Sequence, residues 1–587
     1  MIKSSLSVIW FAGFLISFGC NEGKSEFNPT CEDLGGPSEA ARPELVRNLQ
    51  IGNTGWFSSP AVVDLDGNGS REIVAPFYDV AVWSADGELL ATAPHGEDNG
   101  GHHEGRVYAP AVVHDIDQDG NVEVVVAAGE GTVAAYEWSG GALGIDGGWA
   151  GTTCVQDSCF ENRSLSAGDL DGNGTVEIAV SSTRSEQPPG YEGTNPHVFV
   201  FEADGSLRDG WPRYDTRSGV GADLPGGPDG NCAGHSGYGS YGLNTGIGDI
   251  DDDNDLELLV TYDNHHIQAF NPDGTTLLAD PSFFSQRSGD CEGEPMSWGQ
   301  FIRWLDPDVE RDHYHLHQGE WPHVSWTMWL QWTQSPPSVG DLNGDGLNEV
   351  IGVPNAERDE PYHTYHHALM VLEGDHSSTG NRSARRLAGW EELPLTEEPF
   401  YDDDWYPPAG VPAPTLADIE GDSRPEVLFP GQDGYVYAYS PEAELLWRHG
   451  FAGGAPLAYA SEVAIADLSS DGRPEVIFGV YGEPGTESGR LVILSSNGSL
   501  QHDIELPGQN PDSGNGVGPC AAPTVADLEG DGQLEILLLT IDHGLDVFTV
   551  PGSACNCTPP GADPDLYCGP WPTARGSYLR DGRIPGS

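Results

Sequence analysis

The chain alternates short apolar segments with polar loops along most of its length. Segments such as Pro60–Val63 and Pro414–Ala417 stand directly before a polar loop, and runs such as Val124–Ala127 and Ile536–Leu539 follow one. These segments are too short for helices and rich in branched residues, so we predict buried strands. A third segment then ends in Asp-Gly or Asn-Gly, as at Asp86-Gly87, which favours a tight turn into a fourth strand. The pattern predicts units of four antiparallel strands, the blades of a β-propeller.

A nine-residue motif fills the polar loop between the first two predicted strands and occurs eight times; the copies are called loops one to eight in chain order. Oxygen-bearing side chains stand at positions 1, 3, 5 and 9 of every copy, and position 9 is always Glu. These residues are Asp64, Asp66, Asn68, Glu72; Asp115, Asp117, Asp119, Glu123; Asp169, Asp171, Asn173, Glu177; Asp249, Asp251, Asp253, Glu257; Asp341, Asn343, Asp345, Glu349; Asp418, Glu420, Asp422, Glu426; Asp467, Ser469, Asp471, Glu475; and Asp527, Glu529, Asp531, Glu535.

Calcium chemistry explains this spacing. Ca²⁺ takes six to eight oxygen ligands at about 2.3–2.6 Å, so a loop must curl to aim alternate side chains at one point. A sharp turn at position 6 favours Gly, which adopts left-handed geometry freely; Gly fills it in six copies, with Asn254 and Ser423 in the other two. An EF-hand would need Glu at position 12 and flanking helices. We therefore expect one calcium site per loop, with loops two and four binding more tightly than loops six and seven.

The spacing of the motif predicts how the chain is organised. Successive copies begin between 49 and 92 residues apart, and a blade needs about 50, so extra sequence is expected after loops three, four and five. The last unit has no fourth strand of its own, and Glu44–Gln50 resembles the fourth strand Glu444–His449 of a later unit. We predict that the N-terminal strand completes the last blade and covers its edge.

The expected fold class is therefore all-β, an eight-bladed propeller of four antiparallel strands per blade. Its predicted span is residues 44–587, preceded by a signal peptide at residues 1–19 and a linker at residues 20–43. A His/Trp-rich insertion is expected at about residues 275–335.

The loops and their flanking strands resemble the FG-GAP/VCBS repeat family, whose blades carry calcium loops between their first two strands, as in the integrin α-subunit propeller. The resemblance covers about residues 44–587 and rests on the eight loops given above. It implies a calcium-binding propeller with calcium as its cofactor.

The N-terminus is predicted to be a targeting segment. Lys3 supplies a positive charge, Leu6–Phe18 is an apolar run of signal-peptide length, and Gly19-Cys20 follows at once. A small residue before Cys at this place resembles a bacterial lipoprotein signal, in which Cys20 is lipidated. Cleavage by ordinary signal peptidase is the alternative. Either way we expect the chain to leave the cytoplasm, to be lipid-anchored to a bacterial membrane and exposed outside the cytoplasm, or secreted.

Charge and cysteine content agree with an exported cation binder. The chain has 25 Lys and Arg against 92 Asp and Glu, a net charge of -67, which argues against nucleic acid as a partner because phosphates need a basic surface. Nine cysteines follow Cys20 without a CxxC pair, so disulfides are favoured over zinc. Cys154 with Cys159 would close a tight loop, Cys232 with Cys291 would staple a long insertion, and one cysteine is left over.

The insertion between loops four and five holds six of the 16 tryptophans. Clustered Trp side chains are typical of sugar-binding and protein-binding surfaces, so Trp321, Trp326 and Trp329 are predicted to bind a glycan or protein ligand. The imidazoles of His313–His317 would share one face of an extended segment, as a transition-metal site requires. A rim loop packed by its own aromatic side chains is the alternative that we favour over such a site.

Three functions remain open from the sequence. A cell-surface binding or adhesion propeller explains the signal, the loops and the aromatic insertion. A polysaccharide lyase or hydrolase explains only the insertion, and a structural envelope protein explains only the repeats. We assign no catalytic residue, because no Gly-x-Ser-x-Gly, His-Glu-x-x-His or Walker-type motif is present and calcium loops supply paired carboxylates without catalysis. Enzymatic activity is therefore the less favoured function.

Overall fold

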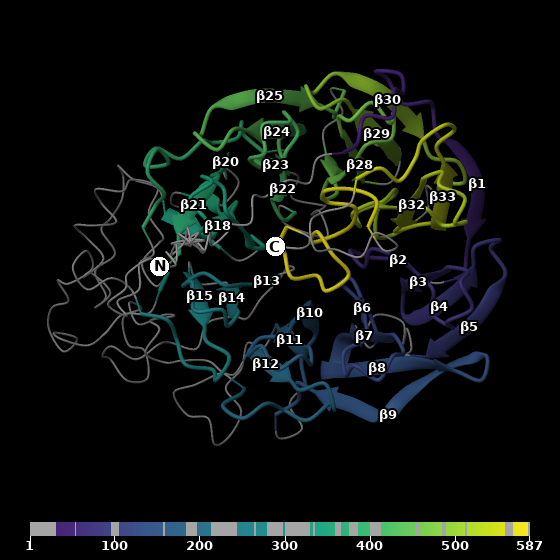
Figure 1. Cartoon of the computed structure of the whole chain (residues 1–587), viewed down its shortest axis with the longest axis vertical. Coiled ribbons are helices and arrows are strands. Elements are labelled where there is room, and N and C mark those ends of the chain that lie inside the picture. The colour runs from purple at the N-terminus through teal and green to yellow at the C-terminus, as the bar shows by residue number, and fades with distance from the viewer. Residues whose placement is uncertain are drawn as a thin grey trace, which may run out of the picture.

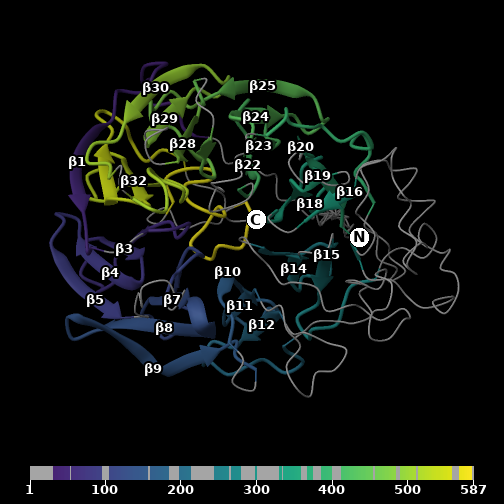
Figure 2. The same cartoon turned by 180° about the vertical axis from the view of Figure 1, so that it is seen from behind.

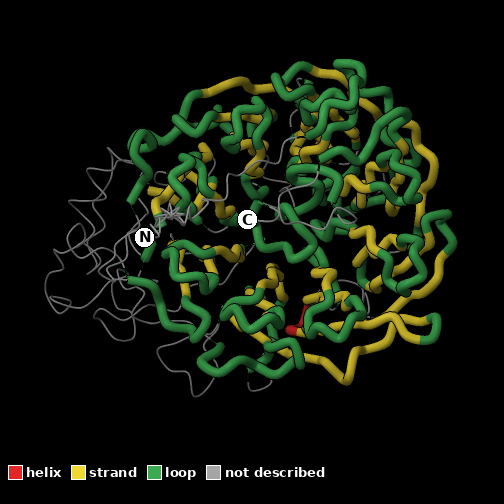
Figure 3. The backbone as a smooth tube through the Cα atoms, in the orientation of Figure 1, coloured by secondary structure: helices red, strands yellow, loops and turns green. Residues whose placement is uncertain are grey.

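The protein is an all-β ring in the computed structural model. Strands and loops account for nearly all of the described chain, and one short 3-10 helix, η1 (Gly129–Gly131), interrupts them (Figure 3). None of the described helices is long and apolar enough to cross a membrane. The structure describes residues 31–52, 55–94, 105–155, 159–183, 197–212, 244–262, 266–278, 298–299, 329–332, 335–357, 366–374, 385–399, 412–453, 457–483, 489–510, 513–557 and 567–584.

Eight antiparallel blades surround a central axis, which confirms the predicted propeller (Figures 1 and 2). Blades one to four contain β2 (Ala61–Val63), β3 (Glu72–Pro76), β4 (Asp79–Ser84) and β5 (Leu89–Pro94); β6 (Val112–His114), β7 (Glu123–Ala127), β8 (Thr132–Ser139) and β9 (Ala142–Thr152); β10 (Asn162–Gly168), β11 (Glu177–Ser182) and β12 (Val198–Phe201); and β13 (Thr245–Gly248), β14 (Glu257–Tyr262) and β15 (His266–Phe270).

The second half of the ring repeats the arrangement. Blades five to eight contain β17 (Ser338–Gly340), β18 (Glu349–Gly352) and β21 (Met370–Glu373), accompanied by β16 (Trp329–Gln331), β19 (Asn355–Glu357) and β20 (His366–His367); β22 (Thr415–Ala417), β23 (Glu426–Pro430), β24 (Tyr435–Tyr439) and β25 (Leu445–Gly450); β26 (Ala458–Ala460), β27 (Ala464–Ala466), β28 (Glu475–Gly482), β29 (Arg490–Leu494) and β30 (Leu500–Glu505); and β31 (Thr524–Ala526), β32 (Glu535–Thr540), β33 (Gly544–Thr549) and β1 (Glu44–Leu49).

Burial decreases from the axis to the rim of each blade. The first two strands of blade six, β22 and β23, are buried throughout, whereas the fourth strands β25 and β30 are partly exposed. Apolar side chains of adjacent blades pack against each other, as Leu416, Phe429 and Phe478 do between blades six and seven. Each sheet therefore buries its faces against its two neighbours, which explains why its inner strands read as uninterrupted apolar runs.

The end of the insertion that we predicted to carry recognition forms a strand, β16. It pairs with β19, which follows β18 along the chain, in a three-stranded sheet of β16, β19 and β20 that is separate from the sheet of β17, β18 and β21. Trp298 and Trp332, two of the six tryptophans of this stretch, are fully buried in one apolar cluster with Leu330 and Met370. These two indoles are core residues, so the count of six overstated the aromatic surface that the insertion offers.

The N-terminal strand closes the ring, as the sequence predicted. β1 pairs antiparallel with β33, with Glu44 opposite Thr549 and Leu49 opposite Leu545. In Figure 1, β1 in purple lies at the outer rim beside the yellow β33. The last blade therefore takes three strands from the end of the chain and one from its beginning, and β1 covers the outer edge of β33.

The C-terminal segment of residues 571–584 lies at the axis of the ring (Figure 1), a placement that we did not predict. The residue two places before position 1 of the loop donates its N–H to this segment in seven blades. The pairs are Val62 with Tyr578 Oη, Val113 with Tyr578 O, Ala167 with Leu579 O, Ile247 with Asp581 O, Val339 with Gly582 O, Ile465 with Trp571 O and Val525 with Pro572 O.

Two buried arginines add bonds from this segment to three of the same blades. Arg575 Nη2 donates to Thr245 O at 2.7 Å and to Pro337 O at 2.5 Å, and Arg580 Nε donates to Ala111 O at 2.9 Å. Because buried carbonyl groups are costly to leave unpaired, the segment acts as a hub that joins the inner strands.

Three disulfides are present among the described residues. Cys154 pairs with Cys159, as predicted, and Cys31–Cys557 and Cys555–Cys568 are the other two. The Cys232–Cys291 prediction lies outside the described residues. Cys520 is the free thiol of the described part and is buried.

His543 lies at the ring closure between two carboxylates. Its Nδ1 is 3.0 Å from Asp542 Oδ1 and its Nε2 is 3.0 Å from Asp546 Oδ2, while its backbone oxygen accepts hydrogen bonds from Asn48 and Gln50 on the N-terminal side. Burial opposes a charge here, but the hydrogen bonds with the two aspartates outweigh it and raise the pKa of His543 to about 9.

A raised pKa stabilises the fold below the unfolded value of 6.5, and this stabilisation is lost as the pH rises through about 9. We expect the free energy of unfolding of the calcium-saturated protein to fall across this window, with roughly 1–3 kcal/mol due to His543. Urea unfolding at several pH values measures it. His543→Gln should flatten the fall, and an equal fall in both proteins would contradict the assignment.

Candidate metal centres

All eight loops share one set of hydrogen bonds around position 1. The position 1 Asp Oδ2 accepts the N–H of position 6 at 2.7–3.1 Å in every loop. The position 5 side-chain oxygen accepts the N–H of position 7 at 2.7–3.0 Å. These bonds curl the backbone around the carboxylates, so the loop conformation is set by its own polar residues.

The position 9 Glu anchors each loop to its second strand. Its Oε2 accepts the N–H of position 2 at 2.8–3.0 Å in all eight loops. Each of these glutamates is buried, with at most 3% of its surface exposed. One carboxylate oxygen is thus used by the backbone, which leaves Oε1 for another partner.

Left-handed backbone geometry occurs at two positions of each loop. Position 6 has a positive φ throughout, Asn254 (71°) and Ser423 (70°) included. Position 4 also has a positive φ in every loop, which we did not predict. The sequence signal for this geometry is the Gly that fills position 4 in five loops. The position 4 residues are Gly67, Gln118, Gly172, Asp252, Gly344, Gly421, Ser470 and Gly530. Non-Gly residues there carry a backbone cost of about 1–2 kcal/mol.

Carboxylates converge in loops one to four. The ligand oxygens of the Asp, Asp and Glu at positions 1, 3 and 9 lie within 4.8 Å of one another in each of these loops. Several of the converging oxygens are buried and accept no hydrogen bond, namely Asp115 Oδ1, Asp169 Oδ1 and Glu257 Oε1; Glu426 Oε1 of loop six is in the same state. Buried oxygens of this kind need a cation or a donor.

Electrostatics give the same indication. Burial, and after it the charges of neighbouring aspartates, raise the pKa of Glu257 to about 9 and the pKa of Glu123 to about 8. Glu349 and Glu426 also have a pKa raised to about 8, and the pKa of Glu72 is raised as well. A divalent cation at the convergence point would favour the charged forms of these groups.

Several loops receive side-chain donors from the protein itself, as in loop six, where Arg424 Nη2 lies 3.1 Å from Asp422 Oδ2. Arg208 approaches Asp171 Oδ2 at 2.7 Å and Glu177 Oε1 at 3.4 Å in loop three. In loop eight, Arg47 pairs with Glu529, and Arg71 pairs with Asp527. Loop seven takes its donors from neutral side chains. The loops therefore differ in how much of their negative charge is left for a bound cation to neutralise.

The predicted recognition residues are mostly not placed. Trp321 and Trp326 lie outside the described residues, as do His313–His317, and Trp329 is the first residue of β16. The buried ring of His367, whose pKa burial lowers to about 3, belongs to the sheet of β16, β19 and β20.

Residues 115–180 match the family of the FG-GAP-like repeat. The matched stretch starts at position 1 of loop two and ends in the second strand of blade three. Residues 115–180 therefore carry an FG-GAP-like repeat, and this repeat lies within an eight-bladed β-propeller. The comparison with curated protein sequences finds no match.

Solved structures resemble the chain distantly. BamB from Moraxella catarrhalis is 12% identical with a TM-score of 0.41, covering 87% of this chain and 99% of that one. The rhamnogalacturonan lyase YesW is 15% identical with a TM-score of 0.42, covering 88% and 76%. A quinohemoprotein alcohol dehydrogenase from Pseudomonas putida is 13% identical with a TM-score of 0.43, covering 92% and 81%. At these values the likenesses carry no functional argument.

Glu257→Gln tests whether the anchoring glutamates are also metal ligands. Glu257 is protonated in the metal-free loop because of its raised pKa, so the melting temperature with chelator should hardly change. Calcium affinity at this loop should fall at least about tenfold, which removes about 1.4 kcal/mol of calcium stabilisation. Melting with and without calcium measures both effects. The exposed Glu505→Gln is the matched control, and an unchanged calcium response of the Glu257 variant would exclude a ligand role.

Proposed function

We propose that the chain is a calcium-binding propeller that works as a cell-surface binding module for a glycan or protein. The observation that carries the calcium part is the convergence of three carboxylates in each of loops one to four, together with buried oxygens that accept no hydrogen bond. Hard oxygen donors with no nitrogen or sulfur among them suit Ca²⁺ rather than zinc or copper.

The loops support a structural role for the ion. Position 9 lies at the start of the second strand and position 1 directly follows the first, so a cation between them ties two strands of one blade. Extracellular calcium-binding modules have dissociation constants of about 10⁻⁴–10⁻³ M, so loops of this kind suit a protein that works outside the cytoplasm. The three disulfides are likewise compatible with an extracytoplasmic protein, and a lipid anchor at Cys20 would hold it at the membrane.

Recognition is assigned to the insertion rather than to the axis or the loops. The axis is filled by residues 571–584, which accept hydrogen bonds from the inner strands of seven blades. Loops bound to calcium are committed to holding their blades. An insertion at the rim can contact a partner without disturbing the strands, and Trp321, Trp326 and Trp329 would supply stacking surface for a sugar or an apolar contact for a protein.

The test combines a binding screen with a tryptophan variant. The mature calcium-loaded protein is screened against a glycan array, acidic polysaccharides and surface proteins, and the ligand found is then titrated. Replacing Trp321, Trp326 and Trp329 with Ala should weaken binding at least about a hundredfold, the cost of losing central aromatic contacts, with calcium-dependent melting nearly unchanged. Full binding by the variant would overturn the assignment, and unsaturated sugar products would indicate a lyase instead.

A further inference from the structure

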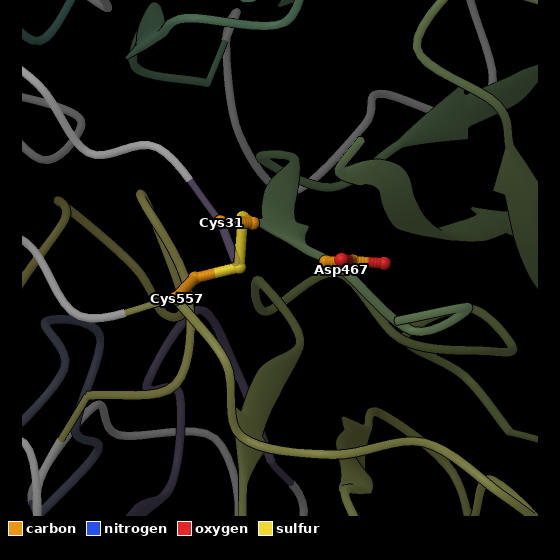
Figure 4. Close-up of side chains that lie close together, drawn as sticks. All are labelled: Cys31, Asp467 and Cys557. Atoms are coloured by element: carbon orange, nitrogen blue, oxygen red, sulfur yellow. A yellow bond between two sulfur atoms is a disulfide. The ribbon is translucent and has the colours of Figure 1, made fainter. Parts of the chain in front are cut away.

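The acidic end of loop seven is more deeply buried than the same part of loops one and two. Asp467 is 0% exposed and Ser469 is 2% exposed, whereas Asp66 and Asp117, which occupy position 3 in loops one and two, are exposed. Figure 4 shows Asp467 beside the disulfide that joins Cys31 and Cys557. The ligand atoms of these three residues lie within 4.8 Å of one another, so both ends of the chain meet at this loop.

Neutral side chains donate hydrogen bonds to the carboxylate oxygens of loop seven. Asn556 Nδ2 donates to Asp467 Oδ2 at 2.7 Å, and Ser469 Oγ donates to Asp467 Oδ1 at 3.2 Å. Gln501 Nε2 donates to Glu475 Oε1 at 3.1 Å. The equivalent Glu257 Oε1 in loop four has no hydrogen-bond partner. Ser469 also replaces a carboxylate by a hydroxyl, which lowers the negative charge that the loop must compensate.

The orientation of the Asn556 amide is fixed by its partners. Nδ2 donates both to Asp467 Oδ2 and to Glu32 O, each at 2.7 Å. A carboxylate and a carbonyl can only accept hydrogen bonds, so the NH₂ group has to face both. The amide therefore binds the same Asp467 oxygen that accepts the N–H of Gly472, and it links the loop to the N-terminal segment.

The N-terminal segment is fitted closely to the loop. The N–H groups of Leu34 and Gly36 both donate to Ser470 O, at 3.1 and 3.0 Å. A Cβ on Gly36 would stand 1.9 Å from Ser469 O, so only glycine permits this approach. Glu32 N donates to Asn556 O at 2.9 Å, which pairs the two chain ends with each other as well as with the loop.

We propose that loop seven binds no metal and serves instead as the docking site for the two chain ends, with neutral side-chain donors satisfying its carboxylates. This proposal rests on the proposed function, because it contrasts loop seven with other loops that bind calcium. In this arrangement the converging carboxylates of loops one, two and four remain available to calcium, whereas blade seven is held by hydrogen bonds that a chelator does not break. The blade would keep the ends of the chain together when calcium is scarce.

Calcium stoichiometry tests the metal-free half of the proposal. Bound calcium per chain is measured by elemental analysis after equilibrium dialysis for the wild type, Asp249→Asn and Asp467→Asn. The loop four variant should lose one ion and the loop seven variant none. Loss of one ion by Asp467→Asn would overturn the proposal. A wild type that binds no calcium would instead overturn the proposed function. Hydrogen exchange would then still test whether the chain ends dock on loop seven.

Hydrogen exchange tests that docking half. In the full-length protein with its disulfides intact, Asn556→Ala should speed exchange of the Leu34 and Gly36 amides at least tenfold, while exchange in the strands of blade four stays unchanged. Gly36→Ala should have the same effect through its clash with Ser469 O. Protection that persists in both variants would show that the chain ends do not depend on loop seven, and would overturn the proposal.

Discussion

Each blade buries one glutamate carboxylate between its first two strands, and the loop is arranged around that charge. The Glu Oε2 accepts the N–H of position 2 in all eight loops, while the position 1 aspartate accepts the N–H of position 6. Backbone groups satisfy only part of these carboxylates, and burial makes the remaining negative charge costly. A cation in the loop, or a donor from the protein, is the compensation that this constraint demands.

Both chain ends then hold the ring that these blades form. β1 completes blade eight through β33, and the segment of residues 571–584 accepts hydrogen bonds from seven inner strands. The Cys31–Cys557 disulfide adds a covalent link between residues 526 positions apart. The first and last segments both contact blade seven, so the folding of this blade and the closure of the ring depend on the same contacts.

Periodicity made the fold and the loops predictable, because a repeated motif fixes strand order and places the same residue types at the same turn. The closing strand was predictable for the same reason, since the last unit lacked a fourth strand. The axial segment was not: it contacts the blades through its backbone and through Arg575 and Arg580, which no hydrophobic pattern reports. Asn556 lies 89 residues from Asp467, so sequence spacing could not show that it reaches loop seven.

Long-wavelength diffraction from crystals grown with calcium tests the central claim most directly, because anomalous scattering locates each ion. The account predicts peaks in loops one, two and four, at the points where the carboxylates of positions 1, 3 and 9 converge. It predicts no peak in loop seven, where the Asn556 amide contacts Asp467. Ordered loops without any anomalous peak, or a peak of equal height in loop seven, would contradict it.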